Sequence, residues 1–246
     1  GTFGNASMTK PDPILFIKDS ALSIKIQKDP SSGTSAGATL PINSGLLLWL
    51  DAMDPTGSGS AGPSTVTSWT DKSGSGNDGK ANKAITLNPN ALGSGLPGMT
   101  FSNNEWFVGN MSITGSTFTA FAIFNMSASS GWAGRVLSLG SPNTYDYNNN
   151  SYITICRLTG NNNDGTFCTF RNNVNQTIKI GLGTNELTSI WVDGSQSYLS
   201  QYGDTPATVK STGNFNVTQY GIGSNTGTND GAGRFTGFIS EIIVFN

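Results

Sequence analysis

Short runs of apolar, β-branched and aromatic residues recur along the chain, separated by Gly, Pro, Asn and Ser. Such runs are typical of strands joined by tight turns. No long stretch shows the 3.6-residue period of an amphipathic helix, and no internal repeat is visible. The pattern therefore predicts an all-β fold in which two antiparallel sheets form a sandwich. The predicted strands cover residues 46–51, 66–70, 98–101, 105–108, 117–126, 134–139, 151–158, 166–171, 176–181, 187–193, 207–210, 215–223 and 235–245.

Two of these strands predict how the sheet closes. Residues 45–52 (GLLLWLDA) and residues 235–246 (FTGFISEIIVFN) are strongly apolar and lie at the two ends of the strand-rich region. A strand of this kind needs a hydrogen-bonded neighbour inside a sheet. We expect the last strand to pair with the early one.

The first 44 residues have a different pattern. Residues 14–17 form a short apolar run, and apolar residues then alternate with polar ones over 22–27, which predicts two strands. A flexible linker follows over 29–39. An isolated hairpin is marginally stable, so we expect this arm (residues 1–44) to dock on the main domain (residues 45–246), on a second copy or on a partner. The predicted docking residues are Ile14, Phe16, Leu22, Ile24 and Ile26.

Composition narrows the function classes. Only 11% of the residues are charged, the net charge is −2, and 35% are hydrophobic. The surface is therefore expected to carry amides and hydroxyls, as in secreted proteins, virion fibres and glycan-binding modules. The scattered Lys and Arg form no basic stripe for nucleic acid. No apolar run approaches the ~20 residues of a membrane span.

The start of the sequence leaves two alternatives. Residues 1–7 precede Met8 and are either the scar of a cleaved tag or a processed native end. If Met8 is the native start, the Lys and Pro residues at 10–13 interrupt any secretory signal. Synthesis in the cytosol together with an exterior type of surface favours a component of a virus particle.

Several segments in order carry a family resemblance. These are residues 45–52, 66–79 (VTSWTDKSGSGNDG), 96–101 (LPGMTF), 117–124 (TFTAFAIF) and 235–246. Together they resemble the laminin-G-like, concanavalin A-like jelly-roll domain. The resemblance implies two curved antiparallel sheets with adjacent ends over residues 45–246. Lectins, adhesion modules, glycosidases and virion components share this fold, so it does not fix the function.

The sequence argues against catalysis. Members of this fold that cleave glycans use a Glu-x-Asp-x-Glu pattern, and none of Glu105, Glu186 and Glu241 has an acidic residue two positions away. Asp51 and Asp54 are three residues apart, which in a strand points them to opposite faces. The chain has no histidine, which excludes Ser-His-Asp triads and His-ligated zinc. Lyase chemistry through Tyr and Arg is the one alternative that these absences leave open, and we expect no enzymatic activity.

One Gly-rich loop is a candidate Ca²⁺ site. Asp71, Asn77 and Asp78 place hard oxygen ligands there, and Ser73 adds a hydroxyl. The alternative is that these side chains hold the loop by hydrogen bonds to its backbone.

Aromatic residues in polar loops are candidates for glycan binding. The candidate residues are Trp132, Tyr145, Asp146, Tyr147, Tyr198 and Tyr202, and for Tyr145 and Tyr147 packing is an equal alternative. The aromatic residues within apolar strands are instead expected in the core; they are Trp49, Trp69, Trp191, Phe118, Phe121 and Phe124. Cys156 and Cys168 flank a predicted turn, where they lie opposite or are offset by one residue, and we favour free thiols.

Three functional hypotheses follow, the third being an enzyme whose catalytic residues the motifs above do not identify. The first is a structural or adhesion protein on the virion surface of a virus, favouring a bacteriophage, as a capsid-decorating or fibre-like part. It would bind other virion proteins through the arm and a host glycan through the jelly roll, and homo-oligomers are compatible with it. The alternative is an extracellular carbohydrate-binding module of a bacterial surface protein or glycosidase.

Overall fold

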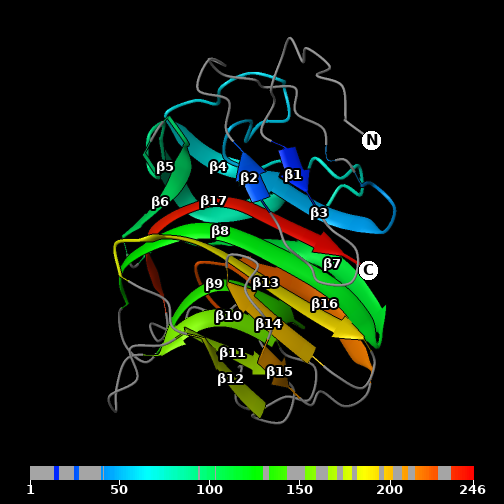
Figure 1. Ribbon diagram of the computed structural model, residues 1–246. Coiled ribbons are helices and arrows are strands. Elements are labelled where there is room, and N and C mark those ends of the chain that lie inside the picture. The colour runs from blue at the N-terminus through cyan, green and yellow to red at the C-terminus, as the bar shows by residue number, and fades with distance from the viewer. Residues whose placement is uncertain are drawn as a thin grey trace, which may run out of the picture.

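The residues described by the computed structural model form antiparallel strands and the turns between them (Figure 1). The structure describes residues 14–16, 25–27, 40, 42–93, 95–102, 104–129, 133–142, 153–158, 166–170, 174–178, 182–193, 197–201, 207–209, 214–226 and 234–246. Within these ranges there is no α-helix, and hence none that is long and apolar enough to cross a membrane.

The strands have the following bounds: β1 (Ile14–Phe16), β2 (Lys25–Gln27), β3 (Leu46–Asp51), β4 (Thr65–Trp69), β5 (Gly79–Asn88), β6 (Gly98–Ser102), β7 (Phe107–Gly115), β8 (Thr117–Ser129), β9 (Ala133–Gly140), β10 (Ile153–Leu158), β11 (Thr166–Phe170), β12 (Val174–Ile178), β13 (Asn185–Asp193), β14 (Ser197–Gln201), β15 (Ala207–Val209), β16 (Phe215–Ile222) and β17 (Phe235–Phe245).

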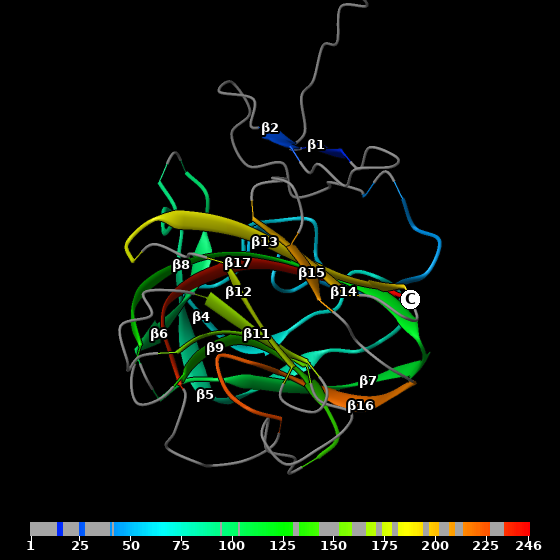
Figure 2. The ribbon, with the colours of Figure 1, turned by 60° about the horizontal axis from the view of Figure 1, so that its bottom comes forward.

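All strands after β2 belong to one curled antiparallel sheet. Its order is β12-β11-β10-β9-β16-β7-β5-β6-β17-β8-β13-β14-β15, with β3 added on β17 and β4 on β5. The sheet bends back on itself, so that a layer containing β17, β8 and β13 faces a layer containing β7, β16 and β9 (Figure 2). The all-β, jelly-roll-like sandwich expected from the sequence is confirmed.

The predicted closure of the sheet is also confirmed. β3 pairs antiparallel with β17, and the register places Asp51 opposite Glu241 and Trp49 opposite Ile243. Beyond the strands, the backbone N–H of Asn246 donates to the carbonyl of Gly45 at 2.8 Å. The last strand lies between β3 and β8, so its backbone is hydrogen-bonded on both sides.

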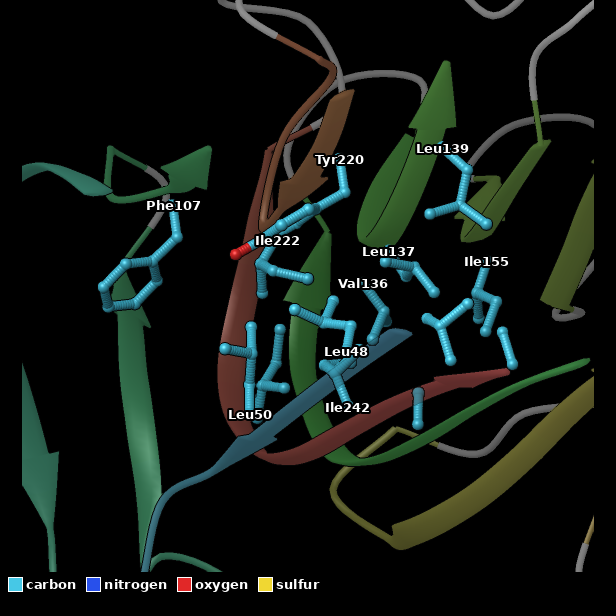
Figure 3. Packing of buried hydrophobic residues seen from close by; sticks show 14 of the residues in the cluster. Leu48, Leu50, Phe107, Val136, Leu137, Leu139, Ile155, Tyr220, Ile222 and Ile242 are labelled. Carbon is cyan, nitrogen blue, oxygen red and sulfur yellow. The ribbon is translucent and has the colours of Figure 1, made fainter. Parts of the chain in front are cut away.

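The core fills the space between the two layers. Leu48 and Leu50 of β3 and Ile242 of β17 point toward Val136 of β9 and Ile222 of β16 (Figure 3). All five are fully buried. Burial of one such side chain contributes about 1.5–3 kcal/mol. The expected core aromatics Trp69, Phe118 and Phe124 belong to this cluster, whereas Trp191 is only half-buried.

A second apolar cluster lies on the other face of β3, β17, β8 and β13. It consists of Trp49, Phe121, Leu187 and Ile243, together with Leu40 from the segment before β3. These side chains are 2–7% exposed, so this outer face of the sandwich is covered. Figure 2 shows β1 and β2 on the outer side of this layer.

The arm contains the predicted strand pair. β1 pairs with β2 in a separate two-stranded sheet, with Ile14 opposite Gln27 and Phe16 opposite Lys25. Of the predicted docking residues, Leu22 and Ile24 lie outside the described residues, and only the backbone is described for the others. Docking of the arm stays a prediction.

Some strands differ from the predictions. β5 and β14 were not expected, and β7 begins at Phe107 and runs on to Gly115, so Glu105 lies in the preceding loop. Between β10 and β11 the register pairs Cys156 with Phe167 and Cys168 with Ile155. The two cysteines are thus offset by one residue, the second of the two expected arrangements.

Candidate functional site

Asp71 organises the loop that follows β4. Its carboxylate accepts hydrogen bonds from the backbone N–H groups of Trp49, Ser73 and Asn77 and from the Ser73 hydroxyl, at 2.8–2.9 Å. Asp78 accepts the N–H of Asp71 at 2.8 Å. The loop is thereby fastened both to itself and to β3.

Glycines and a buried tyrosine complete this loop. Gly74 and Gly76 have φ of +85° and +72°, a conformation in which glycine has no steric penalty. The Tyr220 hydroxyl donates to the carbonyl of Asn77 at 2.6 Å, and Asn77 Nδ2 donates to the carbonyl of Leu47 at 2.8 Å. Burial, with smaller contributions from the Asp71 and Asp78 carboxylates, raises the pKa of Tyr220.

These contacts favour the structural alternative for Asp71, Asn77 and Asp78. Each Asp71 oxygen already accepts two hydrogen bonds from loop donors, and Asn77 directs its amide nitrogen to a carbonyl. A metal ion would have to compete with those donors for the same lone pairs. Within the described residues, no three Cys, Asp or Glu side chains group so that they could hold a metal ion.

The residue after Asp71 is the centre of a second polar cluster. Lys72 Nζ lies 2.8 Å from Asp51 Oδ2, 3.5 Å from Asp54 Oδ2 and 4.2 Å from the centroid of the Trp49 ring. The Lys72, Asp51 and Asp54 side chains are only 3–11% exposed. We call Asp51, Asp54, Lys72, Trp49 and Glu241 the Lys72 cluster.

Glu241 enters this cluster from β17, opposite Asp51. Trp49 Nε1 donates to Glu241 Oε1 at 2.8 Å. Burial and the negative charge of Asp51 raise the pKa of Glu241 to about 8, although the bond from Trp49 and the charge of Lys72 act in the opposite direction. The Glu241–Asp51 pair therefore holds a proton more readily than two isolated carboxyl groups would.

The expectation that Asp51 and Asp54 point to opposite faces is wrong. It assumed that both lie in one strand, but β3 ends at Asp51. The chain turns there, with the N–H of Asp54 donating to the Asp51 carbonyl at 3.2 Å. The turn brings both carboxylates to the same lysine.

A third cluster lies at the surface, where β5, the β6–β7 loop and the start of β17 meet. Asn82 of β5 exchanges two hydrogen bonds with the Trp106 backbone, at 2.9 and 3.0 Å, and donates to the Asn104 carbonyl at 3.0 Å. The Arg234 guanidinium lies 5.1 Å from the centroid of the Trp106 ring and donates to the Asn104 side chain. We call this the Trp106 loop.

Glu105 fixes the inner side of the Trp106 loop. Its carboxylate accepts the N–H groups of Ser102 and Asn104, the Ser102 hydroxyl and, at 2.7 Å, Lys83 Nζ. Burial alone would raise the pKa of Glu105, but these four bonds outweigh it and hold the pKa at about 2. Trp106, the next residue, is half-buried.

Most of the predicted glycan-binding residues lie outside the described residues. These are Trp132, Tyr145, Asp146, Tyr147 and Tyr202. Tyr198 is described by its backbone in β14, where it pairs with Trp191 of β13. Their role in binding stays a prediction.

Lys72, Trp106 and Arg234 were missed by the sequence analysis. The search for a catalytic pair looked only for acidic residues two positions from Glu241. Its acidic neighbour in the fold is Asp51, which is 190 positions earlier in the sequence. The one available signal was a carboxylate within the apolar run FISEIIVF (residues 238–245) of the last strand, since such a charge is costly to bury without partners.

Comparisons with known proteins give the fold but no family. No family model and no curated protein sequence matches the chain. Among solved structures, domain 4 of AbnA, a GH43 extracellular arabinanase from Geobacillus stearothermophilus in complex with arabinotriose, matches with a TM-score of 0.58 and 10% identity. The match covers 82% of this chain and 92% of that one.

Trypanosoma rangeli sialidase is also similar. Two of its structures match with TM-scores of 0.52 and 0.53 at 14% and 12% identity, covering 85% and 89% of this chain. The chain spans about a third of the sialidase, 31% and 33% in the two structures. At such identities the similarity supports the β-sandwich fold alone, and membership of the laminin-G-like family stays a prediction.

Proposed function

We propose that this protein is an extracellular carbohydrate-binding module without glycosidase activity, and that the Trp106 loop contacts the glycan. The observation that carries the proposal is the similarity to domain 4 of the arabinanase, whose nearly full length is matched and which was solved with arabinotriose. This similarity favours the carbohydrate-binding alternative over the virion hypothesis, which no comparison supports.

The Trp106 loop has the chemistry that sugar recognition needs. A half-buried indole offers an apolar surface, and amide and guanidinium groups of Asn82, Asn104 and Arg234 lie around it. A few polar groups placed around an aromatic surface are the usual composition of small-ligand sites. Because the loop is already held by hydrogen bonds, little conformational entropy is lost when a ligand binds.

The glutamates are engaged in ways that favour binding over hydrolysis. Glu105 accepts four hydrogen bonds, Glu186 accepts the Thr184 hydroxyl at 2.7 Å, and Glu241 accepts the Trp49 indole N–H. A retaining glycosidase needs two carboxyl groups about 5–5.5 Å apart on either side of a bound sugar. Glu241 and Asp51 are neighbours, but they lie beside Lys72 and Trp49 rather than in the Trp106 loop.

The test is binding of the whole chain to arabinan, arabinotriose and a glycan array, measured by calorimetry. We expect binding that Trp106→Ala weakens at least tenfold. Leu182→Ala is the matched control, because Leu182 is an apolar side chain that is 47% exposed and belongs to none of the three polar clusters. Absence of binding to every glycan tested would overturn the proposed function.

Substitutions of the predicted tyrosines provide a second test of where the glycan binds. If Tyr145→Ala or Tyr147→Ala abolishes binding while Trp106→Ala does not, the function stands and the site moves to the 143–150 loop. Release of reducing sugar from a bound glycan, in turn, would contradict the absence of glycosidase activity.

A further inference from the structure

The Lys72 cluster holds a primary amine against a carboxyl group in a site nearly closed to water. Lys72 Nζ is 2.8 Å from Asp51 Oδ2, and the two side chains are 11% and 10% exposed. The Trp49 ring lies 4.2 Å from the amine. The attacking nitrogen would have to reach the Asp51 carboxyl carbon, to which Oδ2 is bonded, and reacting atoms held about 3–3.5 Å apart in the right geometry can have effective molarities of about 10⁵–10⁸ M.

The Asp51 carboxyl group is also oriented. The backbone N–H of Met53 donates to Asp51 Oδ1 at 2.8 Å, on the oxygen that does not contact Lys72. If a nucleophile adds to the carboxyl carbon, negative charge develops on that oxygen. A fixed N–H at this position stabilises such a charge.

Glu241 supplies a carboxyl group that can transfer a proton. It is the cross-strand neighbour of Asp51, and its orientation is fixed by the bond from Trp49 Nε1. Burial and the charge of Asp51 raise the pKa of Glu241, so it holds a proton more readily than an isolated carboxyl group. A protonated carboxyl next to an aspartate can lend that proton and take it back.

We propose that Lys72 and Asp51 join in an intramolecular isopeptide bond, with Glu241 as the proton relay. The ammonium group of Lys72 first gives up a proton, and the carboxylate of Asp51 gains one through Glu241. The amine nitrogen then adds to the Asp51 carboxyl carbon, one carbon–oxygen bond breaks, and the oxygen leaves as water. An ammonium and a carboxylate are thus converted into one amide and one water, with no oxidant, reductant or cofactor.

Asp51 fits this reaction better than Asp54. Asp54 Oδ2 is 3.5 Å from Lys72 Nζ and accepts the N–H of Gly59 at 3.1 Å. It has no register contact with Glu241, because it lies in the turn after β3. In the proposed product Asp54 remains a free carboxylate.

The bond would connect the end of β3 to the loop that follows β4. Residues 51 and 72 are then linked covalently as well as through the chain between them. Such a closed loop restricts the unfolded chain, as a disulfide does. The cross-link is independent of the glycan-binding function proposed above.

Mass spectrometry of the intact, reduced protein tests the proposal. We expect the wild-type chain, after incubation at neutral pH, to be lighter than its sequence by the mass of one water. Proteolysis should then release a branched peptide that joins Lys72 to Asp51. A wild-type chain that keeps its full sequence mass would overturn the proposal, and this measurement needs no variant that might fail to fold.

Single substitutions in the Lys72 cluster distinguish the roles of its residues in the cross-link. Lys72→Arg keeps the positive charge but lacks the amine, so it should retain the full mass, and so should Asp51→Ala. Glu241→Gln should retain the full mass or cross-link at least tenfold more slowly, whereas the control Asp54→Asn should lose water as the wild type does. Cross-linking in Asp51→Ala, or at the wild-type rate in Glu241→Gln, would contradict the assigned roles, provided that circular dichroism shows a folded chain.

Discussion

Replacing Asp71 by alanine removes the acceptor that organises the loop over residues 71–78. Asp71 is 7% exposed and accepts four hydrogen bonds. After the substitution, the N–H groups of Trp49, Ser73 and Asn77 lose their partner. The Trp49 N–H lies in the buried β3, and the other two are at the partly accessible loop.

The expected loss of stability follows from these environments. A buried donor left without a partner costs about 1–3 kcal/mol, and each donor that can reach water costs about 0.5–1 kcal/mol. The total for the three donors is about 2–5 kcal/mol. In a domain of this size each kcal/mol corresponds to a Tm shift of about 2–4 °C, so we expect Asp71→Ala to lower Tm by roughly 10 °C. Asp71→Asn should recover little, because its amide nitrogen would face other N–H donors.

Urea unfolding followed by tryptophan fluorescence measures the change, with thermal unfolding as the second readout. The control is Ser75→Ala on the same loop, where an exposed hydroxyl lies 3.5 Å from the Leu46 carbonyl. We expect the control to stay within about 0.5 kcal/mol of the wild type. The reasoning fails if Asp71→Ala behaves like this control. It also fails if excess EDTA lowers the wild-type Tm as much as the substitution does, because Asp71 would then act through a metal ion.

Two more predictions concern Glu105 and the packing of Tyr220. Because the pKa of Glu105 falls from 4.5 to about 2 on folding, its contribution to stability is complete above about pH 4.5 and is lost as the pH falls toward 2. Glu105→Gln should therefore lower the free energy of unfolding by about 1–3 kcal/mol at pH 7, and the difference should disappear in urea titrations near pH 2. At Gly109 an added Cβ would lie 2.4 Å from Tyr220 Cζ and Oη. Overpacking of this kind costs about 1–3 kcal/mol, so Gly109→Ala should shift the urea midpoint downward, and an unchanged midpoint would contradict the packing described here.

The pairing of the first and last strands of the sandwich could be predicted because both are apolar runs that need neighbours. β5 could not, because only Gly79 and Ile85 of its ten residues are buried and Lys80, Asn82 and Lys83 interrupt any alternation. Its backbone is held by β4, β6 and β7 instead. Tertiary pairing outweighs local propensity in such a strand.

The polar clusters, too, could be predicted only where they depend on a local sequence pattern. Asp71 and Asn77 could be singled out, because a Gly-rich loop with carboxylate and amide side chains is a local pattern. The contacts of Glu241 with Asp51 and of Arg234 with Trp106 join residues more than a hundred positions apart. They depend on strand register and on where the sheet bends, which no local pattern contains.

The hydrogen bond between the Asn246 N–H and the Gly45 carbonyl has a consequence for protein engineering. The first and last residues of the strand-rich region, Gly45 and Asn246, therefore lie next to each other. Domains whose ends lie close together tolerate insertion into a loop of another protein and circular permutation. Residues 45–246 could therefore be inserted into a loop of a host protein without separating the two ends of that loop.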